Sequence, residues 1–193
     1  EVLGVLVDDL DQLVLRDVLL RYRGAMFGVI PRTLWGKKMP PDADNRIAMT
    51  MNVLLVRGAG MNVLVDTGAG DKDGEKFRSH YALGPSTLEA ALGARGLAPE
   101  DIHVVFNTHL HFDHAGGNTR RDGAGRVLPA FPNARYLVQR QELEDARAAN
   151  ERNRASYLPD NYEPLLEQGR LELLDGEREI APGLRAFPLP GHT

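Results

Sequence analysis

The chain has 193 residues, of which 42% are hydrophobic, 26% charged and 6% aromatic, as in an ordinary globular domain. A formal net charge of −4 and a pI near 5.9 give no reason to expect nucleic acid or a membrane as partner. Because the chain has no cysteine, disulfides and cysteine nucleophiles are excluded, and a metal site would have to use His and Asp.

Residues 2–20 are rich in leucine and valine, and two structures fit their spacing. The apolar side chains recur at helical intervals, while short stretches also alternate as in a β-strand, so the pattern does not decide. Charged residues interrupt the segment, which excludes a transmembrane helix. It also lacks the basic start and unbroken apolar centre of a signal peptide. We therefore expect a cytoplasmic protein.

An apolar run follows at residues 25–31, with Trp35 just beyond it. Most runs of this kind pack in the core or against a sheet. The alternative is that Met26, Phe27 and Trp35 form one wall of an apolar substrate pocket. The sequence favours the first interpretation and leaves the second open.

Two short apolar segments, residues 50–56 and 61–66, are rich in β-forming residues. The four residues between them include two glycines, which predicts a β-hairpin. The prolines and aspartates of residues 37–45 predict a loop before it. Asp66 ends the second strand, where an aspartate is often a turn residue.

The next predicted unit is a helix, a short loop and a strand. Residues 86–89 form a capping-box pattern, and the helix should end near Gly96. Residues 102–107 form a β-branched run that looks buried. In α/β sheets, functional sites gather at the carboxyl ends of strands. We therefore expect His103, at the start of this strand, to have a structural role, and His80 to be an ordinary surface residue.

The sequence T-H-L-H-F-D-H-A-G-G occupies residues 108–117, directly after that strand. Imidazole and carboxylate are ligands that zinc and similar cations prefer. In an extended segment, His109, His111 and Asp113 would project to one side. His114 would need a change of backbone direction, which the two following glycines make cheap. Two cations could be held, one by the first two histidines and one by Asp113 and His114.

The C-terminal half alternates predicted strands with polar segments. Residues 118–133 predict a loop, residues 134–138 a strand, and residues 141–154 a helix whose Glu and Arg side chains coat a solvated face. Residues 157–164 look irregular, with Tyr157 and Tyr162 more typical of surface packing than of a site. Two further strands are predicted at residues 171–174 and 184–187, and the second leads towards His192.

The H-x-H-x-D-H pattern resembles the signature of the metallo-β-lactamase superfamily, and two other stretches support this resemblance. The sequence V-D-T-G at residues 65–68 is similar to the family's first motif, and L-P-G-H-T at residues 189–193 to the segment with the third histidine. The resemblance covers about residues 51–193 and implies an α/β fold, an αββα sandwich formed by a single domain over residues 1–193. Because the family opens with strands, it also favours strands at residues 2–20.

The resemblance implies the following site. His109, His111 and His192 would hold a first Zn²⁺ ion, and Asp113 and His114 would begin a second site; Mn, Fe or Co could replace zinc. Asp113 would also be catalytic, orienting a metal-bound hydroxide, and Asp66 would fix the ring of a ligand histidine. The family adds a bridging aspartate and a last histidine further on, so we expect a fragment that lacks its C-terminal part, or a natural truncation.

The implied function is hydrolysis of a carbonyl ester in a small-molecule substrate, most like the N-acyl homoserine lactonase and methyl parathion hydrolase members. A lactone is the expected substrate, because the apolar run near Phe27 would suit an acyl chain. The alternatives are a thioesterase of the glyoxalase II type and a non-catalytic metal-binding module of the same fold. A homodimer is a further expectation.

Overall fold

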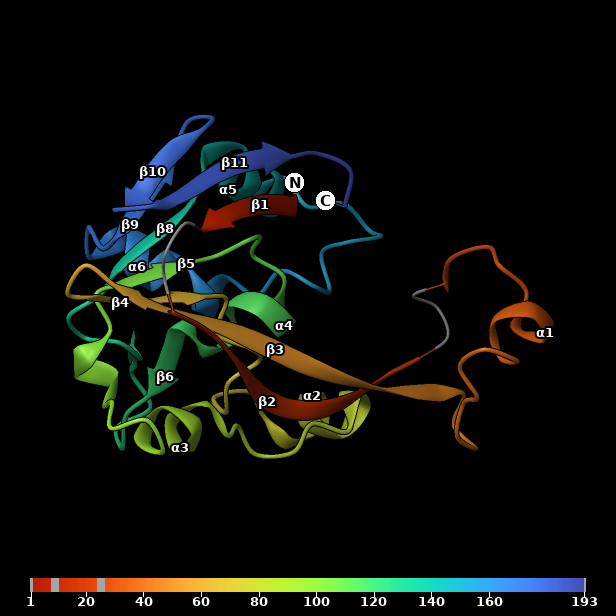
Figure 1. Ribbon diagram of the computed structural model, residues 1–193. Helices are drawn as coiled ribbons and strands as arrows, with labels where there is room; N and C mark the ends of the chain where they lie inside the picture. Colours follow the sequence, from red (N-terminus) through yellow and green to blue (C-terminus); the bar gives the residue numbers. More distant parts are fainter. Residues whose placement is uncertain (1, 8–10, 24–26, 193) are drawn as a thin grey trace.

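The computed structural model describes residues 2–7, 11–23 and 27–192. Its largest sheet has the strand order β2-β3-β4-β5-β8-β9, the second has the order β1-β11-β10, and β6 and β7 form a hairpin (Figure 1). The strands are β1 Val2–Val7, β2 Asp11–Arg23, β3 Arg46–Gly58, β4 Met61–Val65, β5 Val104–Phe106, β6 Thr119–Arg121, β7 Val127–Pro129, β8 Arg135–Gln139, β9 Leu171–Leu174, β10 Arg178–Ala181 and β11 Leu184–Leu189. The α-helices are α1 Arg32–Trp35, α2 Glu75–Tyr81, α3 Leu88–Gly93, α4 Phe112–Ala115, α5 Arg140–Arg147 and α6 Glu163–Glu167. None of the helices in these ranges is long and apolar enough to cross a membrane.

The six-stranded sheet is mixed. Strands β2, β3 and β4 pair antiparallel, whereas β4, β5, β8 and β9 run parallel. The predicted hairpin is confirmed as β3–β4, with Gly58 opposite Met61. Its two turn residues, Ala59 and Gly60, have φ values of 48° and 73°. This left-handed pair matches the twist of the two strands, as in the tightest β-hairpins.

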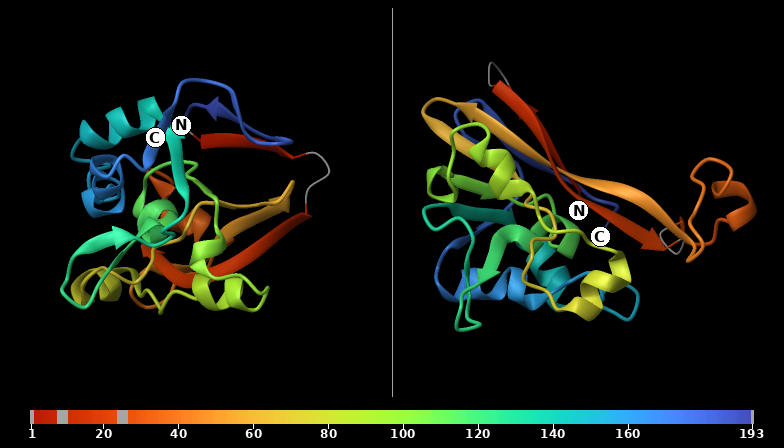
Figure 2. Two further views of the ribbon diagram at one scale, coloured as in Figure 1. Left: turned by 90° about the vertical axis from the view of Figure 1, so that its left-hand side faces the viewer. Right: turned by 90° about the horizontal axis from the view of Figure 1, so that it is seen from below.

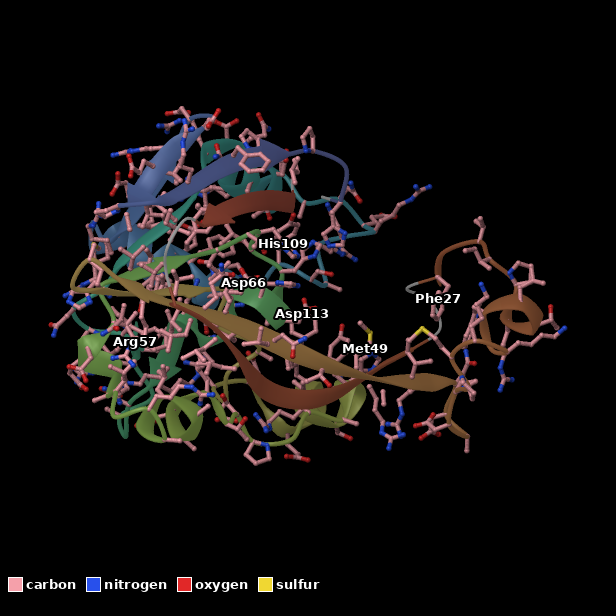
Figure 3. The ribbon with its side chains drawn as sticks, in the orientation of Figure 1. Phe27, Met49, Arg57, Asp66, His109 and Asp113 are labelled. Carbon is pink, nitrogen blue, oxygen red and sulfur yellow. The ribbon has the colours of Figure 1, made fainter. Side chains whose placement is uncertain are left out.

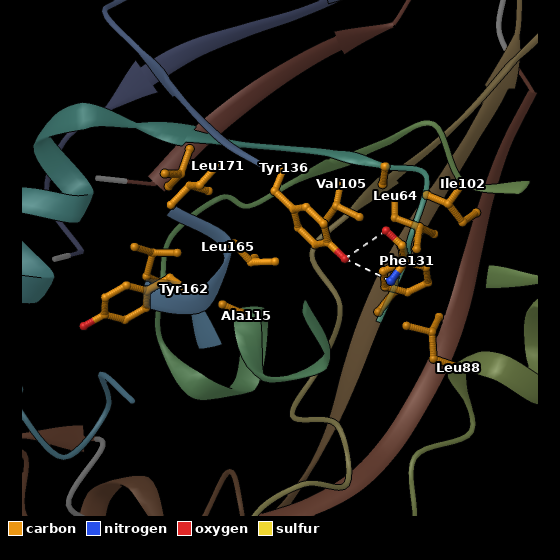
Figure 4. Packing of buried hydrophobic residues seen from close by; sticks show 14 of the residues in the cluster. Leu64, Leu88, Ile102, Val105, Ala115, Phe131, Tyr136, Tyr162, Leu165 and Leu171 are labelled. Carbon is orange, nitrogen blue, oxygen red and sulfur yellow. Dashed lines mark hydrogen bonds between the residues drawn. The ribbon is translucent and has the colours of Figure 1, made fainter. Parts of the chain in front are cut away.

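Both faces of the six-stranded sheet are covered, and this explains the uninterrupted apolar runs of its parallel strands. One face carries Val105, Tyr136 and Val138, which pack with residues of α3, α5 and α6. Figure 4 shows part of this cluster, where the Tyr136 hydroxyl accepts a hydrogen bond from the Phe131 amide at 2.9 Å. The other face packs against β10 and β11 of the second sheet. A mixed α/β fold with two facing sheets is therefore confirmed.

Several local predictions are settled by the observed elements. Residues 2–20 form strands rather than a helix in their described part, since β1 pairs with β11 and β2 with β3. The loop predicted at residues 118–133 is wrong in part, because β6 and β7 form a hairpin there. The helix predicted at residues 141–154 ends at Arg147, and β10 was not predicted. These segments are short, so their own sequence carries little periodicity.

An arm extends from the body of the molecule, formed by the outer parts of β2 and β3 with α1 at its far end (Figures 1 and 2). Phe27 and Trp35 stack on each other within it, with ring centroids 4.6 Å apart. Val29 is fully exposed, and Ile30 and Leu34 are at least half exposed. The prediction that this run packs in the core or against a sheet is therefore wrong for its described residues, apart from the buried ring of Trp35.

Candidate metal centre

The candidate ligands lie at the carboxyl ends of neighbouring strands. Asp66 directly follows β4, and His109 comes three residues after the end of β5, its parallel neighbour. His192 comes three residues after β11 of the facing sheet. Figure 3 shows His109, Asp66 and Asp113 gathered at this end of the sheet. Loops after adjacent parallel strands meet at one edge, which is where α/β proteins place their sites.

Three imidazoles converge on one point. The rings of His109 and His111 lie 4.6 Å apart between centroids, and that of His192 lies 4.8 Å from His109 and 5.3 Å from His111. Each ring offers one nitrogen, and the three nitrogens lie within 4.8 Å of one another. The structure thus brings the distant His192 to the two histidines of the central motif.

One ring nitrogen in each of two of these histidines has no partner within the described part of the chain. The Nε2 atoms of His109 and His111 are buried and make no hydrogen bond there. A buried polar atom without a partner is costly, so such atoms call for an explanation. Because the two orphaned nitrogens face a third imidazole, the arrangement fits a divalent cation that accepts nitrogen ligands.

The backbone around these histidines explains how they come to face one side. Leu110 is fully buried in the main core, and the rings of His109 and His111 project from the opposite side of the extended segment. The expected continuation to Asp113 is wrong. His111, with φ −60° and ψ 148°, is the last extended residue before helix α4. The side chain of Asp113 therefore projects from the first turn of a helix and not from an extended strand.

Asp113 and His114 form a second pair beside the three histidines. Their Oδ2 and Nε2 atoms lie 3.6 Å apart. The His114 ring centroid is 4.0 Å from that of His109, so the pair adjoins the cluster. A carboxylate oxygen and an imidazole nitrogen at this separation could share a second cation.

Asp66 links the two groups through hydrogen bonds. It accepts bonds from the Thr108 amide at 2.8 Å and the Thr108 hydroxyl at 2.8 Å, and pairs with His114 Nδ1 at 2.7 Å. The Thr108 oxygen lies 3.1 Å from His109 Nδ1. Because a carboxylate can only accept hydrogen bonds, the Thr108 hydroxyl donates one to Asp66 and accepts one from the Nδ1–H group of His109. His109 then carries its proton on Nδ1 and presents the Nε2 lone pair, while Asp66 holds the Nδ1 of His114.

The electrostatics separate the histidines into two kinds. Burial, reinforced by the neighbouring imidazoles, holds the pKa of His109 far below its usual range. Burial and the charges of His192 and His114 likewise lower the pKa of His111 to about 4. Burial also acts to lower the pKa of His114, but the hydrogen bond and charge of Asp66, with Asp113, outweigh it and raise that pKa. His109 and His111 are therefore neutral at pH 7, as ligands must be.

Gly116 and Gly117 allow two backbone segments to touch. A Cβ on Gly116 would lie 2.2 Å from the Ala69 carbonyl oxygen, and one on Gly117 would lie 2.2 Å from that of Thr67. Neither glycine has a positive φ. The predicted reason for them, a tight turn that only glycine makes easily, is therefore wrong. Their role is close approach, which brings Asp66 and His114 together.

Sequence reasoning missed two side chains at this site. Glu142 on α5 is fully buried rather than solvated, and its Oε1 accepts a hydrogen bond from the Leu110 amide at 2.8 Å. Tyr157 is also buried rather than at the surface, with its ring 4.6 Å from that of His111. One signal was available: Glu142 lies one residue before Leu143 and four before Ala146, which places it on the buried face of the helix.

The predicted apolar pocket residues lie apart from the histidines. Met26 is outside the described residues. Phe27 and Trp35 stack on the arm, and Phe27 lies well away from His109 in Figure 3. Within this chain the structure does not bring them together with the ligand cluster, so their part in a substrate pocket stays a prediction.

A cavity of about 540 Å³ lies behind the Gly70–Gly117 contact. Its wall includes Lys72, whose ammonium group donates a hydrogen bond to the Gly116 carbonyl. Burial lowers the pKa of Lys72 to about 8. No histidine lines this cavity, so it is separate from the ligand cluster.

The fold has two facing sheets, and a cluster of histidines lies at the ends of its strands. This combination is typical of a metal-binding protein. Residues 49–193 match the family model of the Metallo-beta-lactamase superfamily. The chain belongs to this superfamily. The superfamily fold implies use of a divalent metal, and the histidine cluster could bind one.

Known relatives agree with this assignment. The chain is 32% identical over 143 residues to an N-acyl homoserine lactonase of Bacillus cereus, covering 68% of this chain and 50% of the relative. It is 31% identical over 171 residues to a probable metallo-hydrolase of Mycobacterium tuberculosis, covering 76% and 51%. The chain thus spans about half the length of these curated relatives.

Solved structures show the same fold. A probable metal-dependent hydrolase from Staphylococcus aureus superposes with a TM-score of 0.81 at 31% identity, covering 93% of this chain and 64% of that one. A dizinc quorum-quenching lactonase superposes with a TM-score of 0.68 at 22% identity, covering 93% and 63%. The second likeness shows the fold alone.

Proposed function

We propose that this chain forms the metal-binding part of a hydrolase that opens the lactone ring of N-acyl homoserine lactones. The observation that carries the proposal is the convergence of His109, His111 and His192, with two buried Nε2 atoms that have no partner in the described structure. Lactonases among the relatives support the choice of substrate.

The three histidines would hold one cation, for which we propose zinc, and Asp113 and His114 would contribute to a second. A bound divalent cation lowers the pKa of a coordinated water and polarises a carbonyl group. The fit rests on chemistry that the chain itself shows: His109 and His111 are neutral at pH 7, and His114 pairs through Nδ1 with Asp66.

The side chains have distinct roles in this proposal. Asp113 orients the attacking water, since its carboxylate adjoins His114 and can accept a proton from that water. Asp66 and Thr108 hold the Nε2 atoms of His109 and His114 towards the reacting centre. In the reaction, the water oxygen bonds to the lactone carbonyl carbon and the ring C–O bond breaks. The ring oxygen takes the proton that Asp113 accepted from the water, which gives an N-acyl homoserine whose new carboxylic acid group releases the other proton.

The test uses the complete gene product with added Zn²⁺ and follows ring opening of an N-acyl homoserine lactone by proton release. We expect turnover that falls at least a hundredfold in His109→Ala and is unchanged in His80→Ala, since His80 lies exposed on α2. S-lactoylglutathione is the competing substrate. Its preferred hydrolysis, or lactone turnover that survives His109→Ala, would reject the lactonase assignment.

A further inference from the structure

Glu142 lies behind the ligand segment, on a different element from any of the candidate ligands. It belongs to α5, and its side chain is fully buried. The carboxylate Oε1 accepts two hydrogen bonds, from the Leu110 amide at 2.8 Å and from the Tyr157 hydroxyl at 3.1 Å. One carboxylate oxygen thus contacts two parts of the site that are far apart in the sequence.

The first contact fixes the peptide between two ligands. Leu110 separates His109 from His111, and its amide lies outside the named strands, where a buried N–H would otherwise need another acceptor. The leucine side chain is anchored in the core at 0% exposure. The core holds the Leu110 side chain and Glu142 holds its amide, so both contacts oppose rotation of the segment that carries the two imidazoles.

The second contact supports the ring of His111. The Tyr157 ring packs edge-on against His111 at 4.6 Å, and the backbones of the two residues form an isolated β-bridge. The Ser156 carbonyl accepts a hydrogen bond from the Phe112 amide at 2.8 Å, which continues this pairing. Because Glu142 accepts a hydrogen bond from the Tyr157 hydroxyl, it restricts the ring on which His111 rests.

We infer that Glu142 is a positioning residue for the metal centre: it holds the imidazoles of His109 and His111 in a ligand arrangement and adds a buried negative charge behind them. The inference rests on the proposed metal site. The carboxylate lies directly behind the ligand segment, since its Oε1 is 2.8 Å from the amide of Leu110, the residue between His109 and His111. A nearby negative charge favours a bound cation.

The experiment compares Glu142→Gln with Glu144→Gln. Both substitutions remove one negative charge from α5, but Glu144 is exposed. Affinity for Co²⁺ is measured by competition with a chromophoric chelator, together with the visible absorption of the bound Co²⁺. We expect Glu142→Gln to weaken binding ten- to a hundredfold and to shift the absorption band, as for other residues that orient ligands. Glu144→Gln should stay within twofold of the wild type.

Tyr157→Phe separates positioning from folding. It removes the hydroxyl that Glu142 accepts from but keeps the ring on His111. We expect a three- to tenfold loss of Co²⁺ affinity with little change in melting temperature. If Glu142→Gln does not fold, this variant decides, and wild-type affinity in it would overturn the inference.

Two other results would also overturn it. One is a folded Glu142→Gln with wild-type Co²⁺ affinity and spectrum, which would make the residue only a part of the core packing. The other is a wild-type protein that binds no Co²⁺ at all. Failure of lactone hydrolysis in a protein that binds Co²⁺ would reject the proposed function alone, because the comparison of Glu142 and Glu144 uses no substrate.

Discussion

Replacing Gly117 by alanine tests how the close approach of two backbone segments builds the site. The added Cβ would lie 2.2 Å from the Thr67 carbonyl oxygen, so one atom would have to move about 0.8 Å to reach even 3.0 Å. The segments are tied on both sides of this point. The Thr67 amide donates to the His114 carbonyl at 2.7 Å, and the Gly117 amide donates to that of Gly68 at 2.9 Å.

The cost is steric, because Gly117 has no positive φ that alanine would strain. Overpacking usually costs about 1–3 kcal/mol, and we expect about 3 kcal/mol here since both colliding groups are backbone. In a domain of this size, that lowers the melting temperature by about 6–12 °C. The shift would also separate Asp66 from His114, which are now 2.7 Å apart, so Zn²⁺ affinity should fall at least tenfold.

The assay is thermal unfolding by circular dichroism with a chelator present, followed by Zn²⁺ competition. Gly93→Ala is the matched control, because a Cβ there meets nothing within 4 Å and no positive φ opposes it. It should raise the stability by about 0.4–1 kcal/mol. A Gly117→Ala protein that melts within 2 °C of the wild type and binds Zn²⁺ normally would refute the argument.

Three further predictions concern the histidines and their partner. Asp66→Asn should weaken Zn²⁺ binding ten- to a hundredfold, because a neutral amide holds His114 less firmly; a change within twofold in a competition assay would contradict this. Without metal, the free energy of unfolding should fall as the pH drops from about 6.5 to about 4, because His111 takes up a proton there only when unfolded. The ring is partly exposed, so we expect about 1–2 kcal/mol, and urea titrations in which His111→Gln shows the same pH dependence as the wild type would exclude this cause. His192→Ala should lose the more tightly bound Zn²⁺ by equilibrium dialysis, whereas His80→Ala should keep it; unchanged stoichiometry in both would remove His192 from the centre.

Much of the candidate site could be predicted from local sequence. The spacing of His109, His111, Asp113 and His114 indicated candidate ligands without any coordinates, because the covalent chain alone keeps these residues close together. The strand before them was also predictable, since a buried parallel strand needs apolar residues on both faces. The same reasoning erred at Asp113, because helix α4 begins one residue before it.

Other features depend on contacts between distant segments. The burial of Tyr157 and the contacts of Glu142 follow from where residue 157 and α5 pack, because the spacing to Leu143 and Ala146 places Glu142 on the buried face of the helix but does not reveal which groups it meets. Phe27 lies on an arm that extends from the body of the molecule. An apolar run in the sequence does not show where its segment will lie relative to the rest of the fold.

By itself, the sequence determined which atoms could bind a cation, because side-chain chemistry and spacing along the chain are local properties. Only the tertiary structure decided that His192 meets His109 and His111, since β11 lies in a sheet that faces the one carrying β5. It also decided the role of Gly117, because whether a Cβ fits depends on how closely Thr67 approaches from the neighbouring loop.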